Sequence, residues 1–357
     1  MSGSGSTSPT MLRQSVERLA PSASEAQEAL LWMINGAALT QIVRVAVELR
    51  LPDLLHEQPM TCAEIAKHTG AHFDSIRRLV RALASLGVLD PLEGERYCLA
   101  PIGECLRSGV SDSLRAVACH AGDASMQMAW AALLDTVRTG QPAFDSSFGM
   151  DYGTYLARNA EAARIFHERS RAGAARIIAA VLAVYDFSRF SRIVDVGGGY
   201  GHLVIALLQS YQDARGVVFD LPSAQDGARE LIRSAGVENR CDVVVGSVFD
   251  AVPCGGDLYV LKSMLHGWDD NRCIDLLKNC RRAMSDDAVL MVVERLVPDG
   301  ERPPLYPALV DMTLLVLGVG RERTPGEYGS ILRAAGFRVV RVLPTATEFF
   351  VLEAVPE

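Results

Sequence analysis

Residues 192–201, RIVDVGGGYG, decide the fold of this chain, and an acid follows them at Asp220. The β-branched residues at 193, 194 and 196 are typical of a strand buried on both faces. Glycine fills four of the next five positions, where a Cβ would block a positive φ and keep a ligand from the backbone. HLVIALLQ then continues with apolar residues at helical spacing. A second apolar run, GVVFDLP, places Asp220 where a carboxylate can bind both hydroxyls of a ribose.

The glycine spacing narrows the choice of nucleotide-like ligand. A dinucleotide fingerprint has the pattern G-x-G-x-x-G, but its third glycine position holds His202. The pattern present is G-x-G-x-G, from Gly197 and Gly199 to Gly201, which suits a ligand without a pyrophosphate. S-adenosylmethionine is such a ligand. Two alternatives stay open: NAD, and a glycine-rich turn that binds nothing.

Composition predicts a well-packed protein of two domains. The chain has 357 residues, 49% of them hydrophobic and 22% charged. Its formal net charge of −8 argues against a nucleic-acid partner and gives no signal of membrane-surface binding. No apolar run reaches bilayer length, and the start MSGSGSTSPT lacks a signal-peptide pattern. The eight cysteines are scattered without C-x-x-C spacing, so we expect reduced thiols in a cytoplasmic protein and no metal site.

Four segments are predicted along the chain. Residues 1–20 form a disordered tail. Residues 21–110 combine a helix beginning at Ser24 with a helix–turn–helix and a small hairpin typical of a winged helix. The first helix is expected to pack on a partner subunit, and packing on its own domain is the alternative. Residues 111–185 form a helical linker that roofs the substrate site. Helices are expected from Leu106 to Leu134 and from Tyr155 to Val184, with a loop at 141–153 between them. Phe148 and Phe166 are candidates to line the cavity, and plain core packing is the alternative for each.

Residues 186–357 form the fourth segment, in which strands and helices alternate. This alternation predicts a mostly parallel, doubly wound α/β sheet, whose ligands bind beyond the carboxyl ends of the strands. His266 in KSMLHGWDD and Glu294 in ERLVPDG follow two successive strands there, so both should face one crevice. An imidazole titrates near neutral pH, and a neighbouring carboxylate fixes its tautomer and stabilises the imidazolium. This pair predicts general-base removal of a proton from a phenol, whose pKa is about 10.

These residues resemble the homodimeric small-molecule O-methyltransferases, a family of plant phenylpropanoid and flavonoid enzymes with bacterial polyketide and antibiotic counterparts. VDVGGGYG, FDLP, HGWDD, ERLVP and RERT stand in the family's order and spacing, and the resemblance covers nearly everything after residue 24. It implies a Rossmann-like class I methyltransferase domain preceded by a winged-helix dimerisation domain that does not bind DNA. It also implies S-adenosylmethionine as donor and swapped N-terminal helices in the dimer.

The resemblance also assigns site residues. It implies His266 as the base, flanked by Glu294 and by Glu322 of RERT. The donor site it implies consists of Gly197, Gly199, Asp220, Leu221, Ser247, Val248 and Lys262. The substrate-lining positions it implies are Phe148, Phe166, Met264, Met312 and Leu315.

The chain departs from the family pattern at three positions. Gly267 replaces an Asp that follows the base in many plant members, Ser247 replaces an Asp that would bind the adenine amine, and Ser170 replaces a Met of the linker helix. The third departure makes the plant substrates a poor guide, and the lack of a targeting sequence fits a bacterial enzyme of secondary metabolism.

The sequence therefore predicts methyl transfer to a hydroxyl, expected to be phenolic, of an aromatic natural product. Two alternatives stay open: a relative that performs hydroxylation, decarboxylation or pericyclic chemistry, and a ligand-sensing winged-helix regulator. Nitrogen rather than oxygen as the acceptor atom also stays open.

Overall fold

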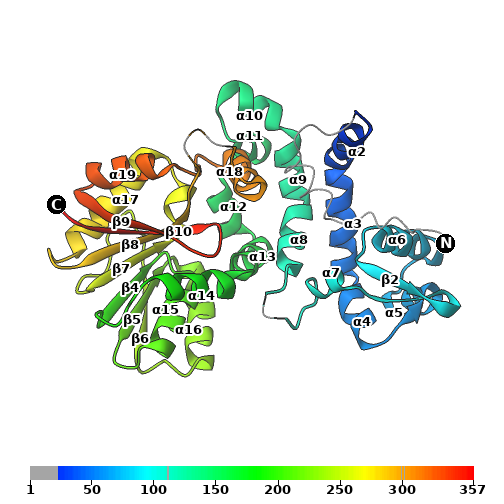
Figure 1. Cartoon of the computed structure of the whole chain (residues 1–357), viewed down its shortest axis with the longest axis horizontal. Coiled ribbons are helices and arrows are strands. Elements are labelled where there is room, and N and C mark those ends of the chain that lie inside the picture. The colour runs from blue at the N-terminus through cyan, green and yellow to red at the C-terminus, as the bar shows by residue number, and fades with distance from the viewer. Residues whose placement is uncertain (1–22, 111, 299, 301) are drawn as a thin grey trace. The chain divides into compact units, whose positions relative to one another are not determined.

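The computed structural model describes residues 23–110, 112–298, 300 and 302–357, which divide into a unit ending at Gln127 and a unit from Met128 to Glu357 (Figure 1). The predicted tail at 1–20 lies outside the described residues. The predicted domain boundaries at 110 and 185 stay predictions, since the compact units divide at another place.

The first unit packs helices around a three-stranded sheet of order β1-β3-β2. Its elements are α2 Ala23–Ile34, α3 Gly36–Glu48, α4 Leu51–Glu57, β1 Met60–Thr61, α5 Cys62–Thr69, α6 Phe73–Ser85, β2 Leu89–Leu92, β3 Arg96–Leu99, α7 Pro101–Glu104 and α8 Arg115–Gly122, while α9 Ala124–Ala131 spans the division. Thr61 and Glu64 form a capping box that starts α5, and Gly70 ends it at φ 65°. The helix, turn, helix and hairpin predicted for this part are therefore present.

The single helix expected from Ser24 is in fact two helices, α2 and α3, bent by 53°. The break falls at Asn35, whose side-chain amide donates to the carbonyl of Leu31 at 2.8 Å, and Gly36 follows it. A local side-chain bond of this kind competes with the helical backbone pattern. In the described part of the chain no single helix is long and apolar enough to cross a membrane. Only α2 and α3 taken together, as a bent pair, have that length and composition.

The second unit contains a seven-stranded sheet of order β6-β5-β4-β7-β8-β10-β9. Its strands are β4 Arg192–Val196, β5 Arg215–Asp220, β6 Cys241–Val245, β7 Leu258–Lys262, β8 Val289–Arg295, β9 Phe337–Pro344 and β10 Phe349–Pro356. Its helices are α10 Leu133–Thr139, α11 Ala143–Phe148, α12 Tyr152–Arg158, α13 Ala160–Arg171, α14 Ala174–Val184, α15 His202–Ser210, α16 Gln225–Ser234, α17 Asp270–Ala283, α18 Leu305–Leu317 and α19 Pro325–Ala334. The first five strands of the order run parallel, and β10 and β9 add antiparallel at one edge, which confirms the mostly parallel sheet.

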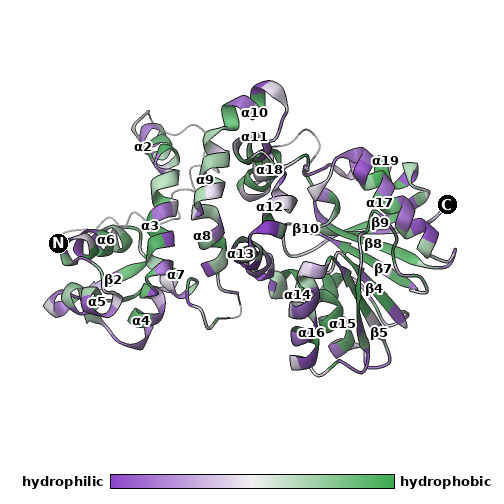
Figure 2. Ribbon diagram, turned by 180° about the vertical axis from the view of Figure 1, so that it is seen from behind, coloured by the Kyte–Doolittle hydropathy of each residue, from purple (hydrophilic) through white to green (hydrophobic). Residues whose placement is uncertain are grey.

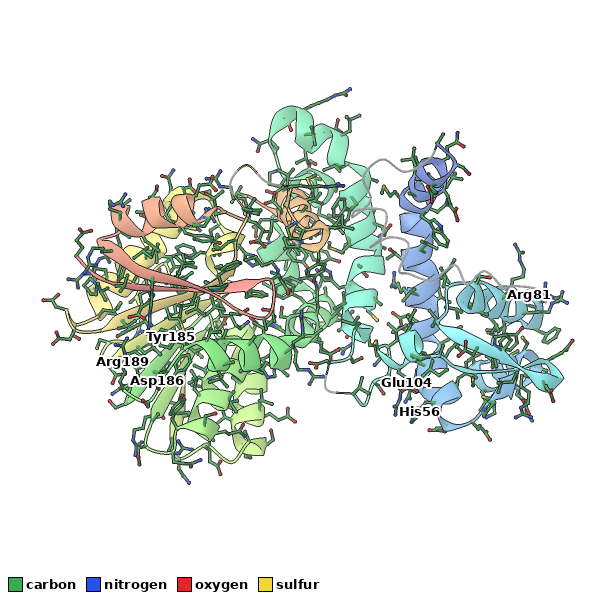
Figure 3. The ribbon with its side chains drawn as sticks, viewed as in Figure 1. His56, Arg81, Glu104, Tyr185, Asp186 and Arg189 are labelled. Carbon is green, nitrogen blue, oxygen red and sulfur yellow. The ribbon has the colours of Figure 1, made fainter. Side chains whose placement is uncertain are left out.

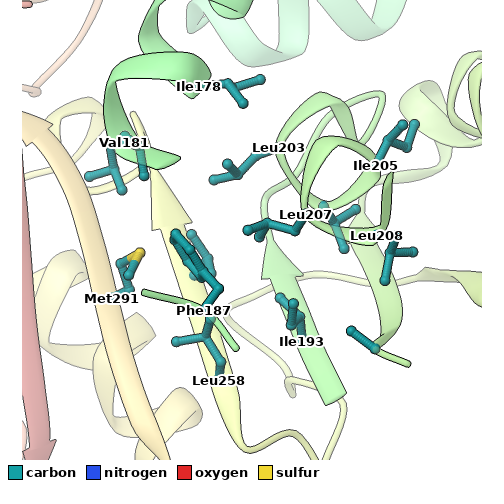
Figure 4. Close-up of a cluster of buried hydrophobic side chains, with 14 of the residues drawn as sticks. Ile178, Val181, Phe187, Ile193, Leu203, Ile205, Leu207, Leu208, Leu258 and Met291 are labelled. Atoms are coloured by element: carbon teal, nitrogen blue, oxygen red, sulfur yellow. The ribbon is translucent and has the colours of Figure 1, made fainter. Parts of the chain in front are cut away.

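Helices cover both faces of this sheet (Figure 1). Strands β4, β7 and β8 are buried almost throughout, and Figure 2 shows the strands as largely hydrophobic ribbons. One core cluster joins the sheet to α14, α15 and α16, with Phe187, Leu203 and Leu258 among its members (Figure 4). The other joins it to α17 and α19. Burial on both faces fixes the strands, and with them the loops at their carboxyl ends, where ligands bind in such folds.

Three expectations for the linker were wrong in detail. The loop predicted at 141–153 contains α11, and the helix predicted from Leu106 to Leu134 begins only at Arg115 and is divided. The helix predicted from Tyr155 to Val184 is three helices, α12 to α14. Asn159 interrupts it at φ −128°, and Gly173 interrupts it at φ 75° in the left-handed region. Glycine favours that region because it has no Cβ.

Candidate active site

The glycine turn after β4 has the left-handed geometry that its sequence predicted. Gly197, Gly199 and Gly201 adopt φ of 69°, 58° and 81°. A Cβ at Gly197 would lie 2.6 Å from Sδ of Met264, and one at Gly201 would lie 2.6 Å from Cγ2 of Val218. A Cβ at Gly199 would meet nothing within 4 Å. The backbone is therefore closely packed on both sides of Gly199 and open at Gly199 itself.

Asp220 lies opposite that turn, at the end of β5. Its Oδ2 accepts the backbone N–H of Gly199 at 2.7 Å, and its Oδ1 accepts that of Leu221 at 2.6 Å. A small pocket beside it is lined by Gly199, Leu221 and Val245, among others. Leu221 and Val245 are exposed at 53% and 38%, so they offer an accessible apolar wall beside the Asp220 carboxylate. The predicted ribose acid and the glycine turn thus meet directly.

Ser247 and Val248 lie in the loop after β6, next to that edge. The hydroxyl oxygen of Ser247 accepts the N–H of Phe249 at 3.2 Å, which leaves the hydroxyl proton available. Val248 is buried, and its carbonyl accepts from Asn279 at 2.8 Å. Hydrogen bonds to its backbone therefore hold this loop in place. Such a fixed backbone is what an adenine would contact, since Ser247 stands where the family's Asp would bind the adenine amine.

Lys262, at the end of β7, belongs to a buried charge group that includes an acid the sequence analysis overlooked. Burial lowers the pKa of Lys262, while Asp195 and Glu294 oppose that effect. Burial raises the pKa of Asp195 to about 6, with Lys262 opposing. Asp195 is an acid within the buried strand RIVDV, and that isolated charge in an apolar run was the signal that could have revealed it.

His266 lies in a single helical turn, Leu265–Gly267, directly after β7. Glu294, fully buried in β8, holds this turn by its backbone: Oε1 accepts the N–H groups of Met264 and Leu265 at 2.8 Å each and that of His266 at 3.3 Å. Its Oε2 lies 3.8 Å from Nδ1 of His266 and has no hydrogen-bond partner. Glu294 therefore positions the turn that carries the imidazole.

Glu322 is the carboxylate that hydrogen-bonds the ring. It follows α18, its side chain is fully buried, and its Oε1 lies 3.1 Å from Nδ1 of His266. The residues alone predict Glu294 in this role, and the structure corrects that prediction. Since Nδ1–H donates to Glu322, the proton-free nitrogen of the neutral ring is Nε2. The His266 side chain is 15% exposed.

The two carboxylates set the charge state of the ring. Burial alone would lower the pKa of His266, but the charge of Glu294 and the hydrogen bond and charge of Glu322 outweigh it, so the pKa lies above its ordinary value. Burial and the nearby Glu322 raise the pKa of Glu294, while His266 opposes them. The ligand atoms of these three residues lie within 4.8 Å of one another, a spacing that could also hold a metal ion.

Arg323 is a second residue that sequence reasoning missed. It is fully buried and donates to the carbonyls of Leu265 at 3.1 Å and Trp268 at 2.6 Å and to Oδ1 of Asp270 at 2.9 Å. These acceptors lie on both sides of His266, so the guanidinium clamps the turn from outside the site. Its place next to Glu322 in RERT was the available signal.

The predicted substrate-lining residues fall into separate places. Phe148 stacks on Phe144 at 4.4 Å between ring centroids, and Phe166 meets Tyr152 edge-on at 5.9 Å. Met312 and Leu315 are half-buried on α18, which packs against α11. Met264 contacts the glycine turn, as described above. Met264 thus lies at the predicted donor site, and the two phenylalanines lie in an aromatic group near α18. That these residues contact the substrate stays a prediction.

Comparison with known proteins identifies the class. Residues 130–338 match the O-methyltransferase domain, and residues 31–109 match the O-methyltransferase dimerisation domain. The chain belongs to this O-methyltransferase family. It is an S-adenosylmethionine-dependent O-methyltransferase, and the dimerisation domain supports the predicted homodimer.

Two relatives and one solved structure are similar to the chain over most of their length. The chain is 41% identical to phenazine O-methyltransferase PhzM of Lysobacter antibioticus over 92% of this chain and 95% of that protein. It is 39% identical to the O-demethylpuromycin-O-methyltransferase of Streptomyces alboniger, over 93% and 89% of the two chains. Among solved structures, LaPhzM superposes with a TM-score of 0.89 at 40% identity, over 93% of this chain and 99% of that one.

Proposed function

We propose that the enzyme transfers the methyl group of S-adenosylmethionine to a phenolic hydroxyl of an aromatic natural product, in the cytoplasm, with His266 as the general base. The observation that carries this proposal is the 3.1 Å contact between Nδ1 of His266 and Oε1 of the buried Glu322. It leaves Nε2 free to accept a proton, and both carboxylates favour the imidazolium that results.

The donor supplies a methyl group already activated on a sulfonium sulfur. Nε2 of His266 removes the acceptor's O–H proton, the oxygen forms a bond to the methyl carbon, and the carbon–sulfur bond breaks to leave S-adenosylhomocysteine. Gly197, Gly199 and Asp220 would hold the ribose end of the donor, and Ser247 and Val248 the adenine. What remains for the protein is alignment and the removal of one proton.

A hydroxyl is favoured over an amine as the acceptor. A phenol has a pKa of about 10, so little of it is ionised at pH 7 and a base speeds its attack. A neutral amine already carries a free lone pair and attacks before it loses a proton. Two of the most similar relatives bear O-methyltransferase names that refer to phenazine and to O-demethylpuromycin, both of which contain aromatic rings.

The test is replacement of the base. With labelled donor, a panel of phenolic metabolites and mass spectrometry, His266→Ala is expected to lower methyl transfer by roughly 10²–10⁴-fold. Affinity for S-adenosylhomocysteine, measured by calorimetry, should stay the same because His266 lies outside the glycine turn. Dialysis against EDTA should leave the wild-type rate unchanged, because Glu322 already occupies Nδ1.

The chain offers a matched control in its first unit. His56 lies 3.0 Å from Glu104 through the same ring nitrogen, but its side chain is 43% exposed (Figure 3). His56→Ala should leave the rate unaltered. A fully active His266→Ala enzyme would mean that catalysis is alignment alone, and the base assignment would be wrong.

A further inference from the structure

The segment between α18 and α19 contacts the turn that carries His266 at several points. Gly320 packs on this turn through its backbone, because a Cβ there would lie 2.8 Å from the carbonyl carbon of Gly267 and closer still to the carbonyl oxygen of His266. Glu322 bonds the imidazole, and Arg323 bonds the carbonyls on both sides of it. The placement of this segment therefore decides where the base lies.

A further contact fixes the segment itself, and it comes from the middle of α18. Oδ1 of Asp311 accepts the backbone N–H of Glu322 at 2.8 Å, across 11 positions of the chain. Asp311 is half-buried, and a carboxylate is a stronger acceptor than a carbonyl. The residue that it holds is the one whose own carboxylate lies 3.1 Å from Nδ1 of His266. Asp311, Glu322 and His266 thus form a connected series from α18 to the imidazole.

The bond from Asp311 does not serve to begin or end a neighbouring helix. The helix α19 has its own capping box, in which Thr324 and Glu327 bond each other's backbone N–H groups at 3.2 and 2.8 Å. The helix α18 ends with the N–H of Gly318 on the carbonyl of Leu314 at 2.9 Å. Asp311 is also the only charged residue in the apolar sequence of α18, LYPALVDMTLLVL. Its carboxylate therefore acts on the placement of Glu322.

The same helix carries residues that are predicted to contact the acceptor. Met312 directly follows Asp311, and Leu315 lies four positions after Asp311, one helical turn along. Val316 is fully buried against Phe144, in the aromatic group described above. One element thus joins the predicted acceptor contacts to the segment that orients the base.

We propose that Asp311 is a positioning residue for methyl transfer, which sets the backbone of Glu322 so that its carboxylate meets Nδ1 of His266. This inference rests on the proposed function and adds a residue to it. Without the acceptor oxygen of Asp311, a displacement of Glu322 by about 1 Å would break the bond to the ring. The neutral ring would then carry its proton on Nε2 for part of the time, where the acceptor's proton has to go.

The experiment compares Asp311→Asn with Asp311→Leu, two side chains of similar shape of which only the amide keeps an acceptor oxygen. The first measurement is the nitrogen NMR spectrum of the full chain, with isotope-labelled histidine and bound S-adenosylhomocysteine, at a pH where the ring of His266 is neutral. Comparison with His266→Ala assigns its signals. The wild type and Asp311→Asn should carry the proton on Nδ1, and Asp311→Leu should carry it partly on Nε2.

The second measurement is the rate of methyl transfer. Asp311→Leu should lower kcat by roughly 10–10²-fold, as expected for a misplaced catalytic group, and should leave affinity for S-adenosylhomocysteine unchanged. Asp311→Asn should retain most of kcat. Asp53→Leu is the matched control, because Oδ1 of Asp53 accepts the backbone N–H of Ser108 at 2.9 Å within the first unit. It should change neither the tautomer nor kcat.

An Asp311→Leu enzyme with the wild-type tautomer overturns the proposal, whatever its kcat. A wild type with its proton on Nε2 overturns it too, and so does an Asp311→Asn enzyme that loses as much as Asp311→Leu, because the acceptor oxygen would then not matter. Asp311→Ala, which only removes atoms, gives the same comparison if Asp311→Leu does not fold. Failure of the base assignment is recognised separately, by an active His266→Ala enzyme, since the tautomer is measured without turnover.

Discussion

At the scale of single residues, two buried carboxylates act on one imidazole in different ways. Glu294 bonds the backbone of the turn through Oε1, at 2.8 Å from the N–H of Leu265, and Glu322 bonds the ring at 3.1 Å. Both charges favour the imidazolium. Glu294 therefore fixes where the imidazole ring lies, and Glu322 fixes which ring nitrogen carries the proton.

The charge of Glu322 should be visible in the pH dependence of catalysis. A base must be neutral to accept a proton, so kcat/KM rises with pH through the raised pKa of His266. Glu322→Gln removes one of the charges that raise this pKa, so the acidic limb of the profile should move to lower pH. The plateau should fall by up to roughly 10²–10⁴-fold, because the tautomer is less well fixed. Glu104→Gln, at the exposed His56 pair, should change neither the position of the acidic limb nor the plateau. If the acidic limb of Glu322→Gln stays at the wild-type pH, Glu322 does not set the pKa of the His266 ring.

Arg323 should act as a positioning residue. Arg323→Met removes the charged donor from the carbonyls of Leu265 and Trp268, while the N–H of Trp268 at 3.2 Å and the thiol of Cys273 at 3.1 Å still donate to Leu265. The variant should therefore lose about 1.5–3 kcal/mol of stability in chemical denaturation, as expected for hydrogen bonds to a charged group. We expect kcat to fall with little change in S-adenosylhomocysteine affinity, and Arg323→Lys to recover part of kcat. Arg321→Ala is the control, since Arg321 bonds Asp270 from an exposed position at 2.7 Å. Equal losses in kcat and donor affinity would instead indicate general unfolding of the site.

At the scale of elements, the turn between β4 and α15 combines packing and ligand access. Gly199→Ala forces a Cβ at φ 58° but meets no atom within 4 Å. Gly236→Ala is matched to it, at φ 70° with nothing within 4 Å, just after α16. Each should cost about 1–2 kcal/mol of stability. Only Gly199→Ala should weaken S-adenosylhomocysteine binding in calorimetry, because its methyl group enters the donor site. Equal donor affinity in both variants would place the donor elsewhere.

The sequence predicts contacts between neighbouring elements better than it predicts contacts that depend on tertiary folding. One strand, one turn and the next strand predict that Gly199 and Asp220 lie at the same edge of the sheet, and in the structure a hydrogen bond of 2.7 Å joins them. The breaks at Asn159 and Gly173 were missed because one Asn or Gly in an Ala- and Arg-rich run lowers helix stability by no more than about 1 kcal/mol, which does not by itself end a helix. The partner of the His266 ring could not be derived from the residues alone, since Glu322 is 56 positions away and reaches the ring only through tertiary folding.

At the scale of the whole molecule, the first unit exposes apolar side chains on α2. Leu30, Leu31, Met33 and Ile34 are exposed at 56%, 58%, 60% and 68%. A contiguous apolar surface on one helix is typical of an interface between subunits. Because the chain carries the family's dimerisation domain, we expect these residues to be covered by the second copy.

The double change Leu31→Glu and Ile34→Glu tests this expectation. Burying two carboxylates at an apolar interface is unfavourable, so the variant should be monomeric at concentrations where the wild type is a dimer, in light scattering coupled to size-exclusion chromatography. Val340→Glu is the control, because Val340 is 48% exposed on the edge strand β9 of the other unit, and it should leave the dimer intact. Far-ultraviolet circular dichroism should show both variants folded. A double variant that remains dimeric would place the interface on another part of the chain and leave the exposed face of α2 without a partner.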